Sequence, residues 1–169
     1  GMSHLVSCCF VHRDLAARNV LIDSVYRCRV ADFGLSRAVA ASNSAAEGEE
    51  EQYYRSARGQ FPVRWTAPEA MDTNKFTTQT DVWSFGVVLG EIFNDGARPY
   101  PDLENLAVMN AVMVGRTDKQ PEQCPADIWE NVMLACWNFD PAKRPSFGEL
   151  VKRLNVAGNS SSRRKNETT

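Results

Sequence analysis

The sequence lacks the features that mark secreted, metal-stapled or membrane-spanning proteins. Its five cysteines, at positions 8, 9, 28, 124 and 136, contain no Cys-x-x-Cys pair. Their odd number also argues against a disulfide framework or a zinc site. No apolar run reaches transmembrane length, and the longest candidate, residues 82–93, is interrupted by Glu91. Free thiols in a reducing compartment, the cytoplasm, are therefore expected.

A large excess of charge of one sign is also missing. The formal net charge is −2 over 169 residues, which gives no general attraction to nucleic acid or to anionic membranes. The apolar content of 43% and the chain length fit one globular domain with a real core. We expect this domain over residues 1–157. A disordered tail is predicted over 158–169, where the composition turns to Asn, Ser, Arg and Lys.

Three short motifs stand out against this ordinary composition. They are His-Arg-Asp-Leu-Ala-Ala-Arg-Asn at 12–19, Asp-Phe-Gly at 32–34 and Ala-Pro-Glu at 67–69. The first places a carboxylate, Asp14, and a carboxamide, Asn19, in one short loop. A second carboxylate, Asp32, follows a predicted strand. These groups suit the binding of Mg²⁺ and the alignment of a hydroxyl for phosphoryl transfer.

In their order and spacing the three motifs resemble the catalytic-loop, Asp-Phe-Gly and Ala-Pro-Glu signatures of protein kinases. Four fixed positions in the first motif alone are expected by chance in about one in 10⁵ windows. The resemblance implies that Asp14 accepts or orients the substrate hydroxyl. It also implies that Asn19 and Asp32 bind Mg²⁺ (or Mn²⁺) and, through the metal, ATP.

Two further segments are similar to tyrosine kinases in particular (EC 2.7.10 class). After Asp14 the chain has Ala-Ala-Arg, so that Arg18 supplies the cation that serine/threonine kinases place two residues after the aspartate. The resemblance implies that Arg18 is a catalytic residue beside the phenol. It likewise implies a substrate platform formed by Pro62, Val63, Arg64 and Trp65. The expected substrates are proteins that present tyrosine.

The resemblance assigns regulatory roles to residues around these motifs. Tyr53 and Tyr54 are candidate autophosphorylation sites, although exposed loop tyrosines without a role are the simpler interpretation. Phosphorylation would add about −1.5 to −2 charges per site, and Arg13 is the expected receptor for them. The twin tyrosines loosely resemble insulin-receptor-like kinases. Dimerisation of the parent for trans-autophosphorylation is a corresponding expectation.

Other motif residues are predicted to be structural. His12 is expected to pack and to form hydrogen bonds, because Asp14 already supplies the base, and Phe33 with Gly34 sets the direction of Asp32. Asp81 is interpreted as a helix cap, as a tie to the catalytic loop, or as both. Glu69 is interpreted either as a capping-box partner of Thr66 or as the ion-pair partner of Arg144.

The family's remaining motifs do not occur in this sequence. There is no Gly-x-Gly-x-x-Gly and no strand with a Val-Ala-x-Lys pattern. We therefore expect an α+β, kinase-like fold represented by its mainly helical C-terminal lobe, with short strands near the catalytic loop. The N-terminal lobe of the same parent, absent here, would be its partner. An alternative is an inactive truncated lobe that serves as a peptide-binding or dominant-negative module.

Hydrophobic patterns predict the elements around the motifs. Short strands are expected at 10–11, 20–22 and 28–30, and a short helix at 66–72. Residues 78–93 are apolar almost all round, which predicts a helix at the buried centre of the lobe. Later helices are expected to turn the following residues inward: Leu106, Met109 and Met113; Trp129, Met133 and Cys136; and Phe147, Leu150, Val151 and Leu154. Ser146 and Glu149 are spaced as a capping box.

Overall fold

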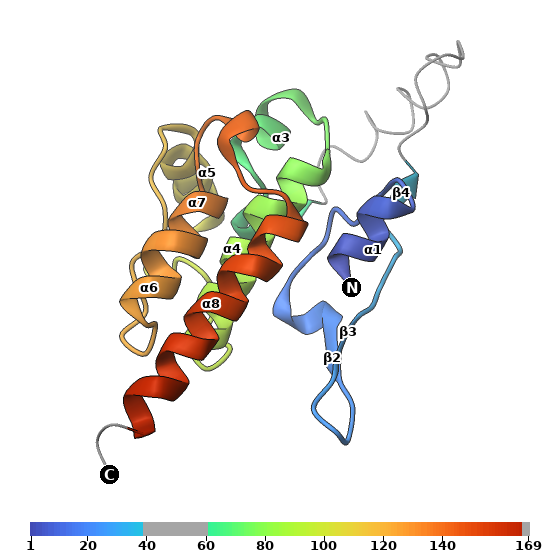
Figure 1. Cartoon of the computed structure of the whole chain (residues 1–169). Helices are drawn as coiled ribbons and strands as arrows, with labels where there is room; N and C mark the ends of the chain where they lie inside the picture. Colours follow the sequence, from blue (N-terminus) through green and yellow to red (C-terminus); the bar gives the residue numbers. More distant parts are fainter. Residues whose placement is uncertain (39–60, 167–169) are drawn as a thin grey trace.

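The structure is a computed structural model that describes residues 1–38 and 61–166, with side chains as far as residue 158. The helices are α1 (Met2–Ser7), α3 (Pro68–Thr73), α4 (Thr78–Phe93), α5 (Asn105–Met113), α6 (Ala126–Ile128), α7 (Leu134–Cys136) and α8 (Phe147–Asn166). The strands are β1 (Phe10–Val11), β2 (Val20–Ile22), β3 (Cys28–Val30) and β4 (Arg37–Ala38). The helices from α4 to α8 gather on one side, and α1 lies with the strands on the other (Figure 1).

Helix α4 begins and is buried as the sequence predicts. The Thr77 hydroxyl accepts a hydrogen bond from the Gln79 N–H at 3.2 Å, and the Thr80 hydroxyl accepts one from the Thr77 N–H at 3.1 Å. These bonds satisfy backbone donors that the first turn leaves unpaired. Trp83 and Val87 of α4 belong to the main hydrophobic core. The central helix is therefore confirmed.

Gly86 allows another helix to approach α4 closely. A Cβ atom at this position would lie 2.7 Å from Nε1 of Trp137 and 2.9 Å from Cβ of Cys136. Both distances are shorter than real side chains tolerate. The absence of a side chain at Gly86 thus permits α7 (Leu134–Cys136) to pack against α4. A π-helical turn, Trp129–Met133, joins α6 to α7.

Two small antiparallel pairings bring the first two motifs together. Strand β1 pairs with β4, with Phe10 opposite Ala38, and β2 pairs with β3, with Val20 opposite Val30. Residues 12–19 connect β1 to β2, whereas residues 32–34 lie within the connection from β3 to β4. The three predicted strands are confirmed. Strand β4 was not predicted, because Arg37–Ala38 is not an apolar run like the other three strands.

The buried face of α5 differs from the prediction. Val108 and Val112 are buried, whereas Leu106 is 65% exposed and Met113 is 37% exposed. Apolar residues occur on several faces of this nine-residue helix, so that periodicity does not decide which face is buried. The 3₁₀ turn η2 (Val63–Trp65) packs against α5. Tertiary packing therefore selects the face.

Helix α8 agrees with the prediction at its beginning and differs further along. The Glu149 carboxylate accepts the Ser146 N–H at 2.7 Å, and the Ser146 hydroxyl accepts the Glu149 N–H at 3.2 Å. The capping box is confirmed, but Val151 is half exposed rather than inward. Helix α8 itself continues to Asn166, and the disordered tail expected over 158–169 stays a prediction. Once a helix is nucleated, each further residue adds one backbone hydrogen bond, which polar composition alone does not prevent.

Within residues 1–38 and 61–166, no helix has both the length and the apolar character needed to cross a membrane.

Candidate active site

Asp14 is held at the centre of the first motif by its own loop. The Asn19 side-chain amide donates to the Asp14 backbone oxygen at 2.7 Å and to Oδ2 of the Asp14 carboxylate at 3.0 Å. The Arg18 guanidinium forms an ion pair with the other oxygen, Oδ1. Both donors come from the 3₁₀ turn η1 (Ala17–Asn19). Asp14 is thus oriented by charge-assisted hydrogen bonds.

A buried carboxylate of α4, Asp81, supports this loop by hydrogen bonds. Asp81 is 1% exposed, and its two oxygens accept the backbone N–H groups of His12 at 2.7 Å and Arg13 at 3.0 Å. Burial raises the pKa of Asp81, and the two N–H donors oppose this shift. Because Thr77 caps the helix, the Asp81 carboxylate is available to accept hydrogen bonds from the loop.

His12 joins the first motif to the second. Its ring is fully buried, Nδ1 accepts the Asp14 N–H at 3.3 Å, and Nε2 donates to the Ala31 backbone oxygen at 3.1 Å. The ring centroid of Phe33 lies 5.4 Å away. With both ring nitrogens bonded and no exposed surface, His12 is a packing residue in this geometry.

The backbone brings Asp32 next to Asn19. The Ala31 N–H donates to the Asn19 backbone oxygen at 2.8 Å, and the Gly34 N–H donates to the Asp32 carboxylate at 3.2 Å. Asp32 has φ = 59° and Arg13 has φ = 69°. Left-handed backbone of this kind costs about 1–3 kcal/mol at a non-glycine residue and is concentrated at functional sites.

The donor atoms of Asn19 and Asp32 fit a magnesium ion. The Asn19 amide nitrogen makes both bonds to Asp14, which leaves its carbonyl oxygen for a metal. Across the described ranges, His, Cys, Asp and Glu form no cluster of three or more that could hold a metal ion. Mg²⁺ does not need one, because one or two protein oxygens with phosphates and water complete its octahedral shell.

The predicted platform divides into an outward and an inward part. Trp65 faces Arg18, whose guanidinium carbon lies 4.6 Å from the centre of the indole. Arg64 is buried, and its guanidinium donates to the backbone oxygens of Pro99 at 2.6 Å and Tyr100 at 2.8 Å. Arg64 therefore anchors the platform to the loop after α4, and its side chain is not presented to a substrate. Pro62 precedes the 3₁₀ turn, and Val63 packs on the core.

Glu91 belongs to this site but was not identified from the sequence, where it counted only as an interruption of an apolar run. It is buried in α4, and one carboxylate oxygen accepts both the Ala17 N–H at 2.8 Å and the Trp65 indole N–H at 2.9 Å. A single charged residue within the largely apolar run 82–93 was the available signal, because charged residues are almost never buried without partners.

The third motif contributes an ion pair. The Glu69 carboxylate accepts from Nη1 and Nη2 of Arg144, at 2.6 and 2.8 Å. Thr66 does not cap this helix with Glu69, since its hydroxyl donates to the Pro62 backbone oxygen at 3.0 Å. Helix α3 has Ala67 at its N-cap and no side-chain cap. The capping-box interpretation of Thr66 and Glu69 is therefore wrong.

The predicted regulatory residues are only partly placed. Tyr53 and Tyr54 lie outside the described residues. The guanidinium carbon of Arg13 lies 5.4 Å from the ring centre of Phe76. The assignment of Arg13 as a phosphate receptor stays a prediction.

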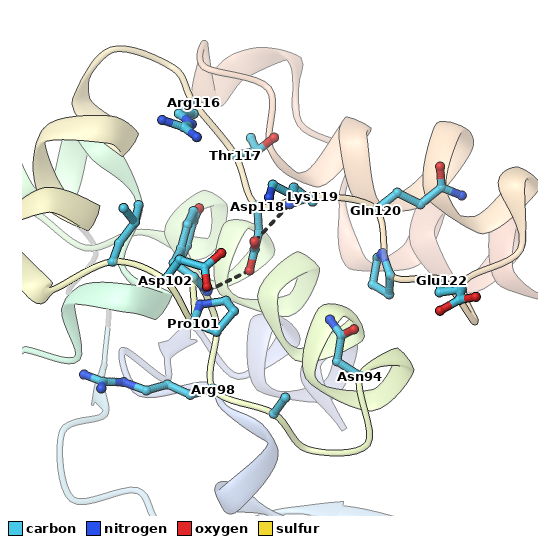
Figure 2. Close-up of a pocket in the computed structure, with 14 residues that line it drawn as sticks. Asn94, Arg98, Pro101, Asp102, Arg116, Thr117, Asp118, Lys119, Gln120 and Glu122 are labelled. Atoms are coloured by element: carbon cyan, nitrogen blue, oxygen red, sulfur yellow. Dashed lines mark hydrogen bonds between the residues drawn. The ribbon is translucent and has the colours of Figure 1, made fainter.

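A separate pocket of about 370 Å³ lies between the loop after α4 and the loop after α5. Asp118 organises it by accepting the Tyr100 N–H at 2.8 Å and the Lys119 N–H at 2.9 Å (Figure 2). Arg98 and Arg116 line it together with Asp102 and Glu122. None of the three motifs contributes to its lining. The pocket is lined in part by the loop that Arg64 binds. Because both positive and negative side chains line it, its charge favours no one class of ligand.

Comparison with known proteins accounts for the motif geometry. Residues 1–154 match the family model described as protein tyrosine and serine/threonine kinase. The chain is 45% identical to ephrin type-A receptor 5 of Gallus gallus and 43% identical to ephrin type-A receptor 4-B of Xenopus laevis. Each match covers 91% of this chain but only 14% and 15% of the respective relative.

These two relatives are ephrin receptors, and the looser resemblance to insulin-receptor-like kinases stays a prediction. The family match spans all three motifs, and it includes Asp14, Asn19, Asp32 and Glu69. The chain therefore belongs to the protein tyrosine and serine/threonine kinase family.

Proposed function

We propose that the protein containing this chain is an ATP- and Mg²⁺-dependent protein tyrosine kinase. One observation carries the proposal: the Asp14 carboxylate is held between Asn19 and Arg18, with Asp32 brought next to Asn19 by the backbone. Phosphoryl transfer depends mainly on positioning and on the neutralisation of charge, and this cluster supplies both.

The residues have distinct tasks in this reaction. Asp14 orients the incoming hydroxyl and accepts its proton. Asn19 and Asp32 offer the oxygen ligands for Mg²⁺ (or Mn²⁺), which would neutralise charge on the phosphates of ATP when bound. Asp81 and His12 keep the loop in place through the contacts described above. Gly34 donates its N–H to Asp32 and so holds that carboxylate.

Tyrosine specificity is supported by the neighbourhood of Asp14. Arg18 lies between the Asp14 carboxylate and the Trp65 ring, so that a cation and an aromatic surface flank the reacting position. A phenol is long and flat, and it suits the apolar platform that we propose for Pro62 and Val63. A serine hydroxyl on its short side chain would not benefit from this arrangement.

An exposed apolar surface supports the assignment of residues 1–157 to the C-terminal lobe of a kinase domain. Leu21 is 58% exposed, Ile22 65% and Val25 62%, all on or beside the β2–β3 hairpin, and Phe33 is 49% exposed. Figure 1 shows this hairpin projecting away from the helices. Apolar surface of this kind is usually covered. We propose that the N-terminal lobe of the parent covers it.

Regulation by phosphorylation is part of the proposal. Tyr53 and Tyr54 are the candidate acceptors, and Arg13 is the candidate receptor for the resulting charge. The relatives are named receptors. This supports a parent that dimerises for trans-autophosphorylation and carries this domain on the cytoplasmic side of the plasma membrane.

Peptide phosphorylation tests the proposal directly. The purified full-length protein is given ATP, Mg²⁺ and two peptides that differ only in tyrosine or serine at the acceptor position. We expect phosphate on the tyrosine peptide alone, detected by mass spectrometry. Equal transfer to serine would contradict the specificity. Peptide binding without any transfer would favour the inactive binding module.

A further inference from the structure

The carboxylate of Glu91 connects two segments that meet at the proposed substrate site. Its Oε2 atom accepts the Ala17 N–H from the catalytic loop and the Trp65 indole N–H from the platform. The loop and the platform are separated by 48 positions in sequence, from 17 to 65, and α4 supplies the bridging group. A buried carboxylate with two donors on one oxygen fixes the distance between those donors.

The two segments joined by Glu91 enclose Arg18. This residue follows Ala17 directly, its guanidinium lies 4.6 Å from the ring centre of Trp65, and it pairs with the Asp14 carboxylate. Displacement of either Ala17 or Trp65 would therefore move the cation beside Asp14. Glu91 itself contacts neither Asp14 nor Arg18 through any hydrogen bond or ion pair in the described part of the chain, so that it acts through its two donors.

We propose that Glu91 is a positioning residue for the tyrosine substrate, a role that rests on the proposed kinase function. Its carboxylate ties Ala17 to Trp65. Arg18 is thereby held beside the position that the phenol must take against Asp14. The residue sets substrate geometry and takes no part in proton transfer. Its removal should mainly impair the tyrosine peptide, and the use of ATP should change little, because Asn19 and Asp32 are bonded independently of Glu91.

Two substitutions of Glu91 separate the loss of both bonds from the loss of charge. Glu91→Ala leaves the Ala17 and Trp65 donors buried without an acceptor. Glu91→Gln keeps one oxygen, which can accept both donors because they already converge on a single atom. Trp65→Phe keeps an aromatic face for Arg18 and removes only the indole donor. Glu149→Ala is the matched control, since Glu149 also accepts a backbone N–H, but it does so in α8 from Ser146, outside the catalytic loop and the platform.

The experiment measures kcat and KM for a tyrosine peptide and for ATP with the full-length protein, normalised to the active fraction. For Glu91→Ala we expect kcat/KM for the peptide to fall about 10²-fold, the scale of a 1 Å misplacement, with the KM for ATP unchanged. Glu91→Gln should recover most of this loss, and Trp65→Phe should give an intermediate loss. Glu149→Ala should match the wild type.

Hydrogen exchange of the same full-length variants gives a readout that needs no catalysis. The peptide carrying the Ala17 amide should exchange faster in Glu91→Ala than in the wild type, in Glu91→Gln or in Glu149→Ala. A lower active fraction with unchanged KM for the peptide would show a merely structural role and overturn the proposal. Unchanged exchange at Ala17 would overturn it as well.

Failure of the proposed function has a different signature from failure of this inference. A wild-type protein that transfers no phosphate to tyrosine overturns the kinase proposal, and the substrate role of Glu91 falls with it. Accelerated exchange at Ala17 would still be observed in that case. A wild-type kinase whose Glu91→Ala variant keeps normal peptide kinetics overturns the role of Glu91 alone.

Discussion

Arg144, in the segment before α8, forms two parallel hydrogen bonds with Glu69 in α3, a residue 75 positions away in sequence. The Arg144 side chain is completely buried, and it also donates to the backbone oxygens of Asn138 at 2.8 Å and Gln79 at 2.9 Å. Its guanidinium carbon lies 5.0 Å from the ring centre of Trp83. The third motif is thus fixed to the helical core by a paired charge.

Glu69→Ala should destabilise the protein by about 3 kcal/mol, because it leaves the Arg144 charge buried without its partner. Lys143→Ala is the adjacent control. Its ion pair with Asp140 is longer, at 3.6 Å, and lies on the surface. Lys143→Ala should therefore lower the free energy of unfolding by less than about 1 kcal/mol. Urea unfolding of the two variants measures both values. Equal costs would show that burial of the Arg144 pair has no energetic consequence.

Two glycines of α4 should respond to alanine in opposite directions. At Gly86 a methyl group would clash with Trp137 and Cys136, which should cost about 1–3 kcal/mol. At Gly90 the nearest neighbour would be the Met133 methyl group at 3.7 Å, an ordinary contact. Gly90→Ala should therefore stabilise the helix by up to about 1 kcal/mol. Thermal unfolding of both variants checks the sign, and destabilisation by Gly90→Ala would contradict the packing described.

Thiol labelling should divide the five cysteines into two groups. Cys8, Cys9 and Cys28 are exposed, whereas Cys124 and Cys136 are buried. Burial raises the pKa of the Cys136 thiol to about 12, so that little reactive thiolate is present at pH 8. Iodoacetamide followed by mass spectrometry should modify the first three in the native protein and all five after unfolding. Rapid native labelling of Cys136 would contradict the fold.

The raised pKa of the Cys136 thiol predicts that the folded protein loses stability in alkali. The folded protein holds the Cys136 proton up to about pH 12, whereas the unfolded chain releases it near 9.0. Because the folded pKa is raised, its contribution to stability is present below pH 9.0 and is lost as the pH rises toward 12.

Asp81→Asn should loosen the catalytic loop. An asparagine offers one acceptor oxygen where Asp81 offers two, so that either the His12 or the Arg13 N–H loses its partner, at a cost of about 1–3 kcal/mol. Hydrogen exchange at those two amides should accelerate. Asp127→Asn is the control, since within the described residues Asp127 accepts a hydrogen bond only from the exposed Asn131 side chain. If the His12 and Arg13 amides of Asp81→Asn stayed as protected from exchange as in the wild type, the proposed support of the catalytic loop by Asp81 would be contradicted.

Sequence patterns predicted the elements whose signals are local. The α4 helix and the Ser146–Glu149 capping box depend on neighbours within a few residues, and both are confirmed. The motif residues were identified because their identity and order are specific. The α5 helix shows the limit, since its packing against the 3₁₀ turn at Val63–Trp65 and against α3, not a local pattern, decides that Val108 is buried and Leu106 exposed.

Contacts between distant segments were harder to predict. The inward direction of Arg64 depends on backbone oxygens of Pro99 and Tyr100, which no local pattern reveals. The role of Glu91 depends on the meeting of Ala17 and Trp65. Such residues are found in sequence only as charged groups at apolar positions, and their partners have to come from the fold.

The most direct test of the central claim is phosphate transfer to a tyrosine peptide by the full-length protein and its Asp14→Asn variant. Asp23→Asn is the control, because Asp23 interacts with Val25, Arg27 and Arg29 of the exposed β2–β3 hairpin and with no motif residue in the described part of the chain. We expect the rate of Asp14→Asn to fall at least about 10²-fold and that of Asp23→Asn to match the wild type. Equal rates for Asp14→Asn and wild type would contradict the assignment of Asp14 and the proposed mechanism.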